Sequence, residues 1–209
     1  MRDGDAVDEC RFAHISTVVT TPPAFRETVG LLTRHDWHGP TTHAIFVLGE
    51  RKTCRVSVVL LTGTDAPLAS FTSALEQIAP ALDGIASSPV LARQSFDVAF
   101  WDLAEWQRAN AVRLTRLNIV PSGVEVLSTI GRAAVARLRS TTPGFRGAIA
   151  LSNAASGKAI FIELFTTRAA LRDSEVTAYF DARNAREAGV LTVPPEHEVY
   201  QLHPLASSN

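Results

Sequence analysis

The order strand–helix–strand–strand–helix–strand occurs twice along this chain, and this order restricts the fold more than any other feature of the sequence. In the second half, the elements follow from apolar periodicity and from the turn residues between them. They are a strand over Arg113–Val120, a helix from Val124 to near Ser140, strands over Phe145–Leu151 and Ala159–Thr166, a helix over Arg168–Ala188 and a strand over Glu196–His203. This order predicts a ferredoxin-like fold.

The first half has the same order. Its elements are a strand over Phe12–Thr20, a helix opened by Pro22 and Pro23, a hairpin of His43–Leu48 with Arg55–Leu61, a helix over Leu68–Leu82 that Pro80 should end or kink, and a strand over Arg93–Leu103. The two hairpins align without a gap, because Val58 and Leu60 fall on Ile162 and Leu164, 104 positions later. We interpret this match as a tandem duplication, with repeats at 1–103 and 111–209 and a linker at 104–110.

This interpretation predicts an α+β protein in which two repeats pack against each other. A four-stranded antiparallel sheet with two helices on one face leaves its other face to be covered. Two such faces can cover each other within one chain and close a barrel-like core. A monomer or a homodimer then satisfies the sheet faces.

Local signals fix the ends of two helices in the second repeat. Ser122 and Glu125 have the spacing of a capping box, which predicts a helix N-terminus with Ser122 as the cap. Gly189 stands where the last helix should end. Along that helix, Val176, Tyr179 and Phe180 share one face.

The composition limits the classes of partner that this chain is expected to bind. The 20 Lys and Arg residues against 21 Asp and Glu give a net charge of −1, so no overall field recruits nucleic acid or an anionic membrane. The polar, acidic start lacks the pattern of a signal peptide, and the apolar runs are too short to span a bilayer. Cys10 and Cys54 could form one disulfide, but two cysteines make no disulfide framework, which favours a reduced, cytoplasmic setting.

The stretch from Arg113 to Leu202 resembles the antibiotic biosynthesis monooxygenase family of the dimeric α/β-barrel superfamily. The resemblance rests on the strand end Asn118–Gly123, the turn Pro143–Gly147, the hairpin Gly157-Lys158, the strand Phe161–Phe165, Ser174 with its helix and the end Glu198–Tyr200. It implies oxygenation of aromatic, phenolic substrates with O₂ and without metal or flavin. The substrate would lie between the sheet and its helices, with Asn118 at the position of a substrate-binding asparagine. Phe165 stands where many members carry a tryptophan.

Asn118 and Glu163 are the candidate catalytic residues. An amide at Asn118 would hold a phenol or quinone oxygen without adding charge to an apolar pocket, or else it pins the turn that follows. Glu163 shares a strand face with Phe161 and Phe165, so burial would raise its pKa and suit it to take a phenolic proton. The alternative for Glu163 is an ion pair with Arg113, Arg116 or Arg146.

The expected substrate-binding residues are Asn118, Phe161, Phe165, Tyr179 and His14, the last placed in a first-repeat pocket near the level of Asn118. No metal is expected: His35, His38 and His43 lie close in sequence, but no metalloenzyme motif accompanies them. Three tryptophans are interpreted as packing between the two repeats rather than as a substrate cage: Trp37, Trp101 and Trp106.

The leading hypothesis is therefore a cofactor-independent monooxygenase that binds a small aromatic molecule in its second repeat. A non-catalytic binding or assembly module with the same fold is the first alternative. A haem protein of the same superfamily is the second, and it would need His197 or His203 to point toward the helices.

Overall fold

A computed structural model describes residues 10–37, 41–63, 67–83, 88–176, 185–186 and 188–205. The strands are β1 Phe12–Val19, β2 Thr42–Glu50, β3 Arg55–Thr62, β4 Ser88–Asp102, β5 Ala111–Asn118, β6 Phe145–Asn153, β7 Lys158–Phe165 and β8 Glu196–His203. The α-helices are α1 Phe25–Arg34, α2 Pro67–Asp83, α3 Val124–Thr141 and α4 Arg168–Asp173, and two 3₁₀ turns are Trp106–Arg108 and Pro121–Gly123. The fold is thus α+β.

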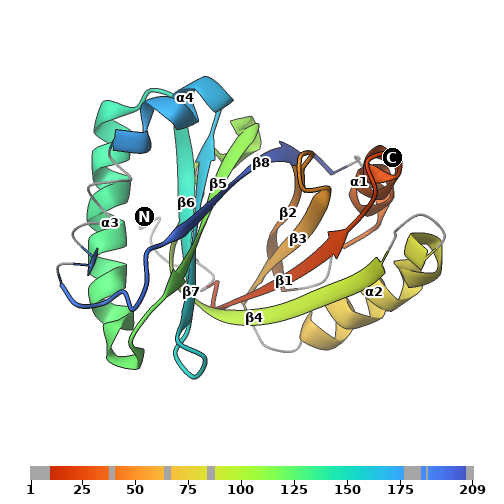
Figure 1. The fold of residues 1–209 in the computed structure, drawn as a ribbon, viewed down its shortest axis with the longest axis horizontal. Coiled ribbons are helices and arrows are strands. Elements are labelled where there is room, and N and C mark those ends of the chain that lie inside the picture. Colours follow the sequence, from red (N-terminus) through yellow and green to blue (C-terminus); the bar gives the residue numbers. More distant parts are fainter. Residues whose placement is uncertain are drawn as a thin grey trace, which may run out of the picture.

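The strands form one closed antiparallel barrel in the order β1-β3-β2-β8-β5-β7-β6-β4. The first four strands are neighbours in the order β4-β1-β3-β2, and the last four in the order β8-β5-β7-β6. The two groups join at β2–β8 and at β4–β6, which closes the barrel within a single chain. Figure 1 shows α1 and α2 outside the first group and α3 and α4 outside the second.

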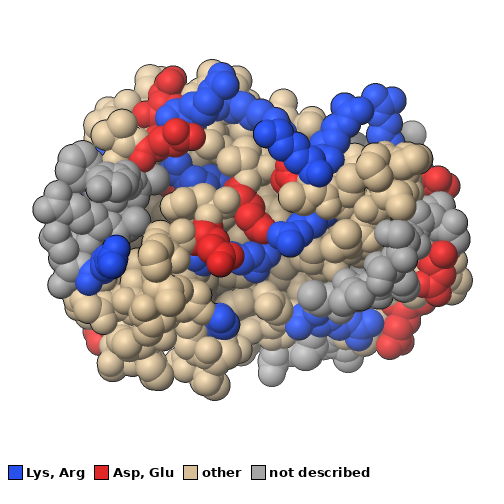
Figure 2. Space-filling model, in the orientation of Figure 1, with Lys and Arg blue, Asp and Glu red and all other residues tan. Residues whose placement is uncertain are grey.

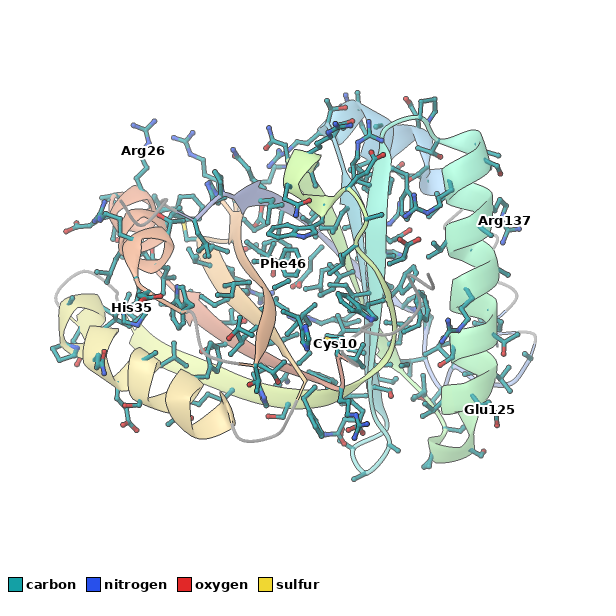
Figure 3. The ribbon with its side chains drawn as sticks, turned by 180° about the vertical axis from the view of Figure 1, so that it is seen from behind. Cys10, Arg26, His35, Phe46, Glu125 and Arg137 are labelled. Carbon is teal, nitrogen blue, oxygen red and sulfur yellow. The ribbon has the colours of Figure 1, made fainter. Side chains whose placement is uncertain are left out.

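The barrel interior is one apolar cluster to which all eight strands contribute. Alternate residues of each strand point inward, as the two-residue period of a strand requires. Phe46 and Cys10 belong to this cluster and lie between the strands, whereas Arg26 and Arg137 extend outward from α1 and α3 (Figure 3). Two further clusters lie outside the barrel, one beneath α1 and α2 and one beneath α3 and α4.

The hairpins of the two halves correspond at a shift of 103 positions, so the shift of 104 expected from the sequence is wrong. Glu50 pairs with Arg55 at the tip of β2–β3, and Asn153 pairs with Lys158 at the tip of β6–β7. Val58 and Leu60 lie beneath the helices, whereas Ile162 and Leu164 face the barrel interior. A slip of one residue turns every side chain to the other face of a strand, and apolar residues on both faces hide the slip from sequence alignment.

The predicted capping box is also wrong. Helix α3 begins at Val124, its N-cap is Gly123, and no side chain caps it. Ser122 lies inside the 3₁₀ turn Pro121–Gly123, which runs directly into the helix, so Ser122 does not occupy the N-cap position.

Only the first part of the predicted helix over 168–188 can be compared with the structure. Helix α4 covers Arg168–Asp173, Thr167 caps it by accepting a hydrogen bond from the Ala170 amide, and residues 177–184 lie outside the described part of the chain. Val176, at the end of this described segment, is 68% exposed. Tyr179 and Phe180 fall outside the described residues.

Trp101 and Trp106 pack against the barrel interior, as their interpretation as packing residues requires. The Trp106 ring lies 5.0 Å from the Phe46 ring, so the segment between the halves contacts β2. Trp37 lies instead in the cluster beneath α1 and α2, away from the barrel interior, and its indole nitrogen donates to the Leu32 carbonyl at 2.7 Å.

Charged groups of both signs lie side by side near the centre of the face shown in Figure 2. Of the helices that the structure describes, none has both the length and the apolar character that crossing a membrane requires. Cys10 and Cys54 are free thiols, and both are buried.

Candidate functional site

A pocket of about 70 Å³ lies between α3 and the outer face of the second group of strands. Most of its lining is apolar, and three polar side chains contribute to it: Thr115, Glu163 and His197. The apolar lining comprises Leu117, Leu127, Ile130, Gly131, Ala134, Ala150, Ile160, Phe161, Ala185, Leu191 and Pro195. An apolar pocket with a few convergent polar groups is typical of a small-molecule site.

Small residues let α3 approach the sheet at the pocket. A Cβ added at Gly131 would lie 2.7 Å from Cε1 of Phe100 and 3.6 Å from Cε2 of Phe161, so the helix backbone is already in contact with both rings. Ala134 also lines the pocket from α3, and Ala150 lines it from β6. The larger Leu127 and Ile130 side chains close it along the helix.

Two arginines hold α3 against β4 and so fix one wall of the pocket. Nε of Arg139 donates to Asp102 at 2.7 Å, and the second nitrogen of the same guanidinium bonds the other carboxylate oxygen. Arg132 lies 5.2 Å above the Phe100 ring, within the range of a cation–π contact.

Thr115 and His197 form the polar end of the pocket. They lie opposite each other in the β5–β8 register, and the Thr115 hydroxyl is 2.9 Å from Nδ1 of His197. Burial lowers the pKa of His197 below its ordinary value, and the charge of Arg113 lowers it further, while Glu163 and Glu175 act in the opposite direction. His197 is therefore a neutral imidazole near neutral pH.

Glu163 is present in the pocket as the partner of Arg113. Nε and Nη2 of Arg113 donate to the two carboxylate oxygens at 2.6 and 2.7 Å, and both side chains are 4% exposed. This is the ion pair with Arg113 that the sequence offered as the alternative to a free base. Nη1 of Arg113 is buried and has no hydrogen-bond partner among the described residues.

Asn118 does not line this pocket. It lies at the end of β5 on the opposite strand face from Thr115, and its side-chain oxygen accepts a hydrogen bond from Lys158 across the hairpin. Its backbone carbonyl accepts from the Thr192 amide at 3.0 Å. The structure thus places Asn118 as a residue that secures the end of the strand, away from Phe161 and Glu163.

The predicted aromatic residues divide between the pocket and the packing around it. Phe161 lines the pocket and lies 5.9 Å from the Phe100 ring. Phe165 is fully buried, 5.5 Å beneath the Arg113 guanidinium and 5.7 Å from the Phe145 ring, and it is not part of the lining. Tyr179 lies outside the described residues, so its predicted contact with a ligand stays a prediction.

His14 belongs to a different part of the molecule. It is fully buried on β1, its Nδ1 is 3.0 Å from the Ser95 hydroxyl, and its ring is 6.2 Å from Phe71 of α2. His14 pairs with Leu60 of β3, and Arg113 pairs with Glu163 of β7. Because Leu60 and Glu163 are equivalent at the shift of 103 positions, His14 corresponds to Arg113 rather than to Asn118.

The predicted absence of a metal site was argued from three histidines, of which two are described. His35 stacks edge-on against Trp37 at 4.7 Å, and His43 lies 5.9 Å from Trp101. His38 is outside the described residues. Within the described part of the chain, no three His, Cys, Asp or Glu side chains group as metal ligands would.

Sequence reasoning missed Thr115 and considered His197 only as a ligand for haem. His197 alternates with Val199 on β8, which is the one signal that places it on the helix side of the sheet. Thr115 gave no signal, because its contact with His197 depends on how β5 and β8 align.

No family model matches this sequence, and no curated protein matches it. Solved structures do share its fold. An anthrone oxidase-like protein is 12% identical with a TM-score of 0.69, over 93% of this chain and 92% of that one. A proposed monooxygenase from Lactobacillus acidophilus is 13% identical with a TM-score of 0.67, over 93% of this chain and 94% of that one.

A third structure has the same architecture. An uncharacterised ferredoxin-fold protein from Listeria monocytogenes, related to antibiotic biosynthesis monooxygenases, is 8% identical with a TM-score of 0.55, over 92% of this chain and 95% of that one. At such low identities the likeness shows the fold, and it assigns no residue of this chain to a reaction.

Proposed function

We propose that this protein binds a small aromatic or phenolic molecule in the pocket between α3 and the sheet and oxygenates it with O₂, without metal or flavin. The observation that carries the proposal is the apolar pocket with its polar end formed by Thr115, His197 and Glu163. A flat aromatic ring suits walls of leucine, isoleucine, alanine and phenylalanine, and its oxygen would face the polar end.

The proposed reaction needs no external reductant. For a substrate with an activated CH₂ group, CH₂ and O₂ give C=O and H₂O, so the substrate supplies all the electrons. The protein then has two tasks, to orient the substrate and to remove its proton. The likeness to an anthrone oxidase-like protein supports an anthrone or a related polycyclic phenol as the substrate class.

The role of base for Glu163 stays a prediction, and its geometry counts against it. Both carboxylate oxygens accept hydrogen bonds from Arg113, so a substrate hydroxyl would compete with a charged donor for either oxygen. The same facts favour the second candidate function, a binding module without catalysis, since Asn118 does not line the pocket and Glu163 lines it only as the partner of Arg113.

The residues present do not fit haem. His197 does face the helix side, but helix and sheet meet at Gly131, Phe100 and Phe161, and a macrocycle would have to part them. His203 lies at the β2–β8 seam, against Gly49 rather than in the pocket.

We also infer that the chain consists of two tandem ferredoxin-like repeats, at 1–103 and 111–209, joined at 104–110. The equivalent strand orders of the two halves and the matching hairpin registers support this division. Because the barrel closes within one chain, a monomer suffices and a homodimer is optional. Two free buried thiols accord with a cytoplasmic location.

The pocket can be tested by filling it. Ala134 is 2% exposed and lines the pocket, while its neighbour Ala133 is exposed on the same helix. Calorimetric titration with para-nitrophenol should show binding to the wild type and to Ala133→Leu, and a loss of about tenfold or more in affinity in Ala134→Leu. Equal affinities in all three would place the ligand elsewhere.

Oxygenation can be tested separately. Oxygen uptake with dithranol, a dihydroxyanthrone, is measured with protein that has been treated with a metal chelator and contains no flavin. The rate is compared with that of the spontaneous oxidation of dithranol. Uptake that exceeds the spontaneous rate and is lost in Ala134→Leu supports the monooxygenase. Binding without uptake supports the binding module instead.

A further inference from the structure

We propose that His197 accepts the proton of the bound phenolic hydroxyl through Nε2, and that Thr115 is the positioning residue that holds the imidazole for this step. The inference rests on the proposed function, since it concerns the same pocket, and it names the group that ionises the ligand. No feature of the sequence by itself had assigned this role to His197.

Strand register brings the two side chains together. Thr115 and His197 are direct partners in the antiparallel β5–β8 pair, so their side chains lie on one face of the sheet. Both line the pocket, and the Thr115 hydroxyl is 2.9 Å from Nδ1. When Nδ1 carries the ring hydrogen and donates it to Thr115, Nε2 is left with its lone pair for the ligand.

The surrounding charges suit a base that is neutral before the reaction. Arg113 on β5, Glu163 on β7 and Glu175 beyond α4 are the charged groups that act on His197, and Arg113 and burial together lower its pKa. The imidazole is therefore unprotonated near neutral pH. The imidazolium and the phenolate that form are adjacent opposite charges, which attract each other most strongly in a poorly solvated pocket.

The step is a simple proton transfer. The phenolic O–H bond breaks, an Nε2–H bond forms, and the electron pair stays on the phenolate oxygen. Thr115 continues to accept the Nδ1 hydrogen in the imidazolium, so the hydrogen bond persists through the transfer. The phenolate is then the electron-rich species that reacts with O₂ in the proposed reaction.

Other groups are less suited to this step. Glu163 lines the pocket, but Arg113 occupies both of its oxygens. His14 is fully buried against Ser95 and Phe71 in the first half of the chain. Within the described lining of the pocket, His197 is the side chain that combines a neutral lone pair with access to the ligand.

The experiment uses para-nitrophenol, whose phenolate form absorbs visible light, at a pH about one unit below the pKa of the free probe. The wild type should show the phenolate band on binding. His197→Gln should bind with an affinity within about fivefold, the ordinary worth of one hydrogen bond, yet lose the band. His203→Gln, on the same strand but outside the pocket, should keep both.

Thr115 gives a second, independent test. Thr115→Val keeps the shape of the side chain but removes the acceptor, so it should weaken the phenolate band, and Thr115→Ser should restore it. If Thr115 had only a structural role, the substitutions would change the stability of the protein, but the phenolate band would be the same in Thr115→Val and Thr115→Ser. If the proposed oxygenation also holds, His197→Gln should lower dithranol-dependent oxygen uptake by about 100-fold.

The outcomes separate the two proposals. Binding of the probe with an undiminished phenolate band in His197→Gln overturns the role of His197 and leaves the pocket intact. Failure of the wild type to bind the probe overturns the proposed function, and this inference with it. A phenolate band that depends on His197 in a protein without oxygen uptake supports the inference and overturns only the oxygenation.

Discussion

Arg113 and Glu163 form a bidentate ion pair across β5 and β7, with both side chains buried on the helix side of the sheet. The pair lies two residues along the strands from Thr115 and Phe161, which are themselves opposite each other. Burying a charged pair costs solvation free energy, and only an attraction between the two charges in good hydrogen-bonding geometry offsets this cost. The pair therefore supports the polar end of the pocket and is sensitive to the loss of either member.

Replacing Glu163 by Gln should destabilise the protein, because it leaves the Arg113 charge buried without its partner. The free energy of unfolding should fall by about 3–5 kcal/mol, measured by chemical denaturation. The double variant Arg113→Met, Glu163→Leu should recover most of this loss, since apolar residues of similar size often replace buried pairs. An unchanged stability with at least tenfold lower oxygen uptake would instead support Glu163 as the base.

Two glycines in helices should respond to alanine with opposite signs. A Cβ at Gly131 would lie 2.7 Å from the Phe100 ring, so Gly131→Ala should cost about 1–3 kcal/mol and displace α3 from the pocket. A Cβ at Gly30 of α1 meets only the flexible end of Arg34, at 3.1 Å, so Gly30→Ala should stabilise by about 0.5–1 kcal/mol. Thermal unfolding of both variants tests this prediction, and stability changes of the same sign in the two variants would contradict it.

The β2–β8 seam should be a weak point of the barrel. It consists of three register pairs, centred on Leu48 with Leu202. A Cβ at Gly49 would lie 2.7 Å from Nε2 of His203 and 2.9 Å from Cζ of Phe25, so Gly49→Ala should force the two strands apart. Hydrogen exchange of amides along β2 and β8 should accelerate, while exchange along β6 and β7 stays as in the wild type. Uniform acceleration would mean global destabilisation instead.

Acidification should weaken the fold partly through His203. Burial lowers the pKa of His203 below its ordinary value of 6.5. The unfolded chain therefore binds the proton at a higher pH than the folded one, so stability is full above about 6.5 and falls as the pH drops below it. In His203→Gln, the plot of unfolding free energy against pH should be shallower in this range. His197 has the same sign, so the double variant with His197→Gln should be shallower still.

The element order could be predicted because each element carries its own periodicity. The last strand has the predicted bounds Glu196–His203, and Phe25, Val29 and Leu32 of α1 are buried as their helical spacing indicates. Helix α3 begins at Val124 as predicted, but Ser122 was wrongly predicted as its N-cap, because a 3₁₀ turn and a capping box share the same local residues. Helix ends depend on backbone angles that the residue types leave open.

The candidate site could be predicted only in part. Phe161 and Glu163 were expected on one face of their strand because they alternate along it, and Arg113 was among the named partners of Glu163. Asn118 lies outside this pocket, and the sequence did not indicate this because its strand face and its contact with Lys158 depend on where β5 ends. Thr115 and His197 are 82 residues apart, and no local pattern connects them.

The sequence by itself determined which segments become strands and helices, because that information lies within a few neighbouring residues. Only the tertiary structure decided the register between strands, and with it the shift of 103 rather than 104 positions, the face on which Glu163 lies and the meeting of Thr115 with His197. The physical reason is that apolar residues occupy both faces of these strands, since one face fills the barrel and the other packs beneath the helices. Two registers that differ by one residue then look alike in sequence, and the closing of the barrel selects between them.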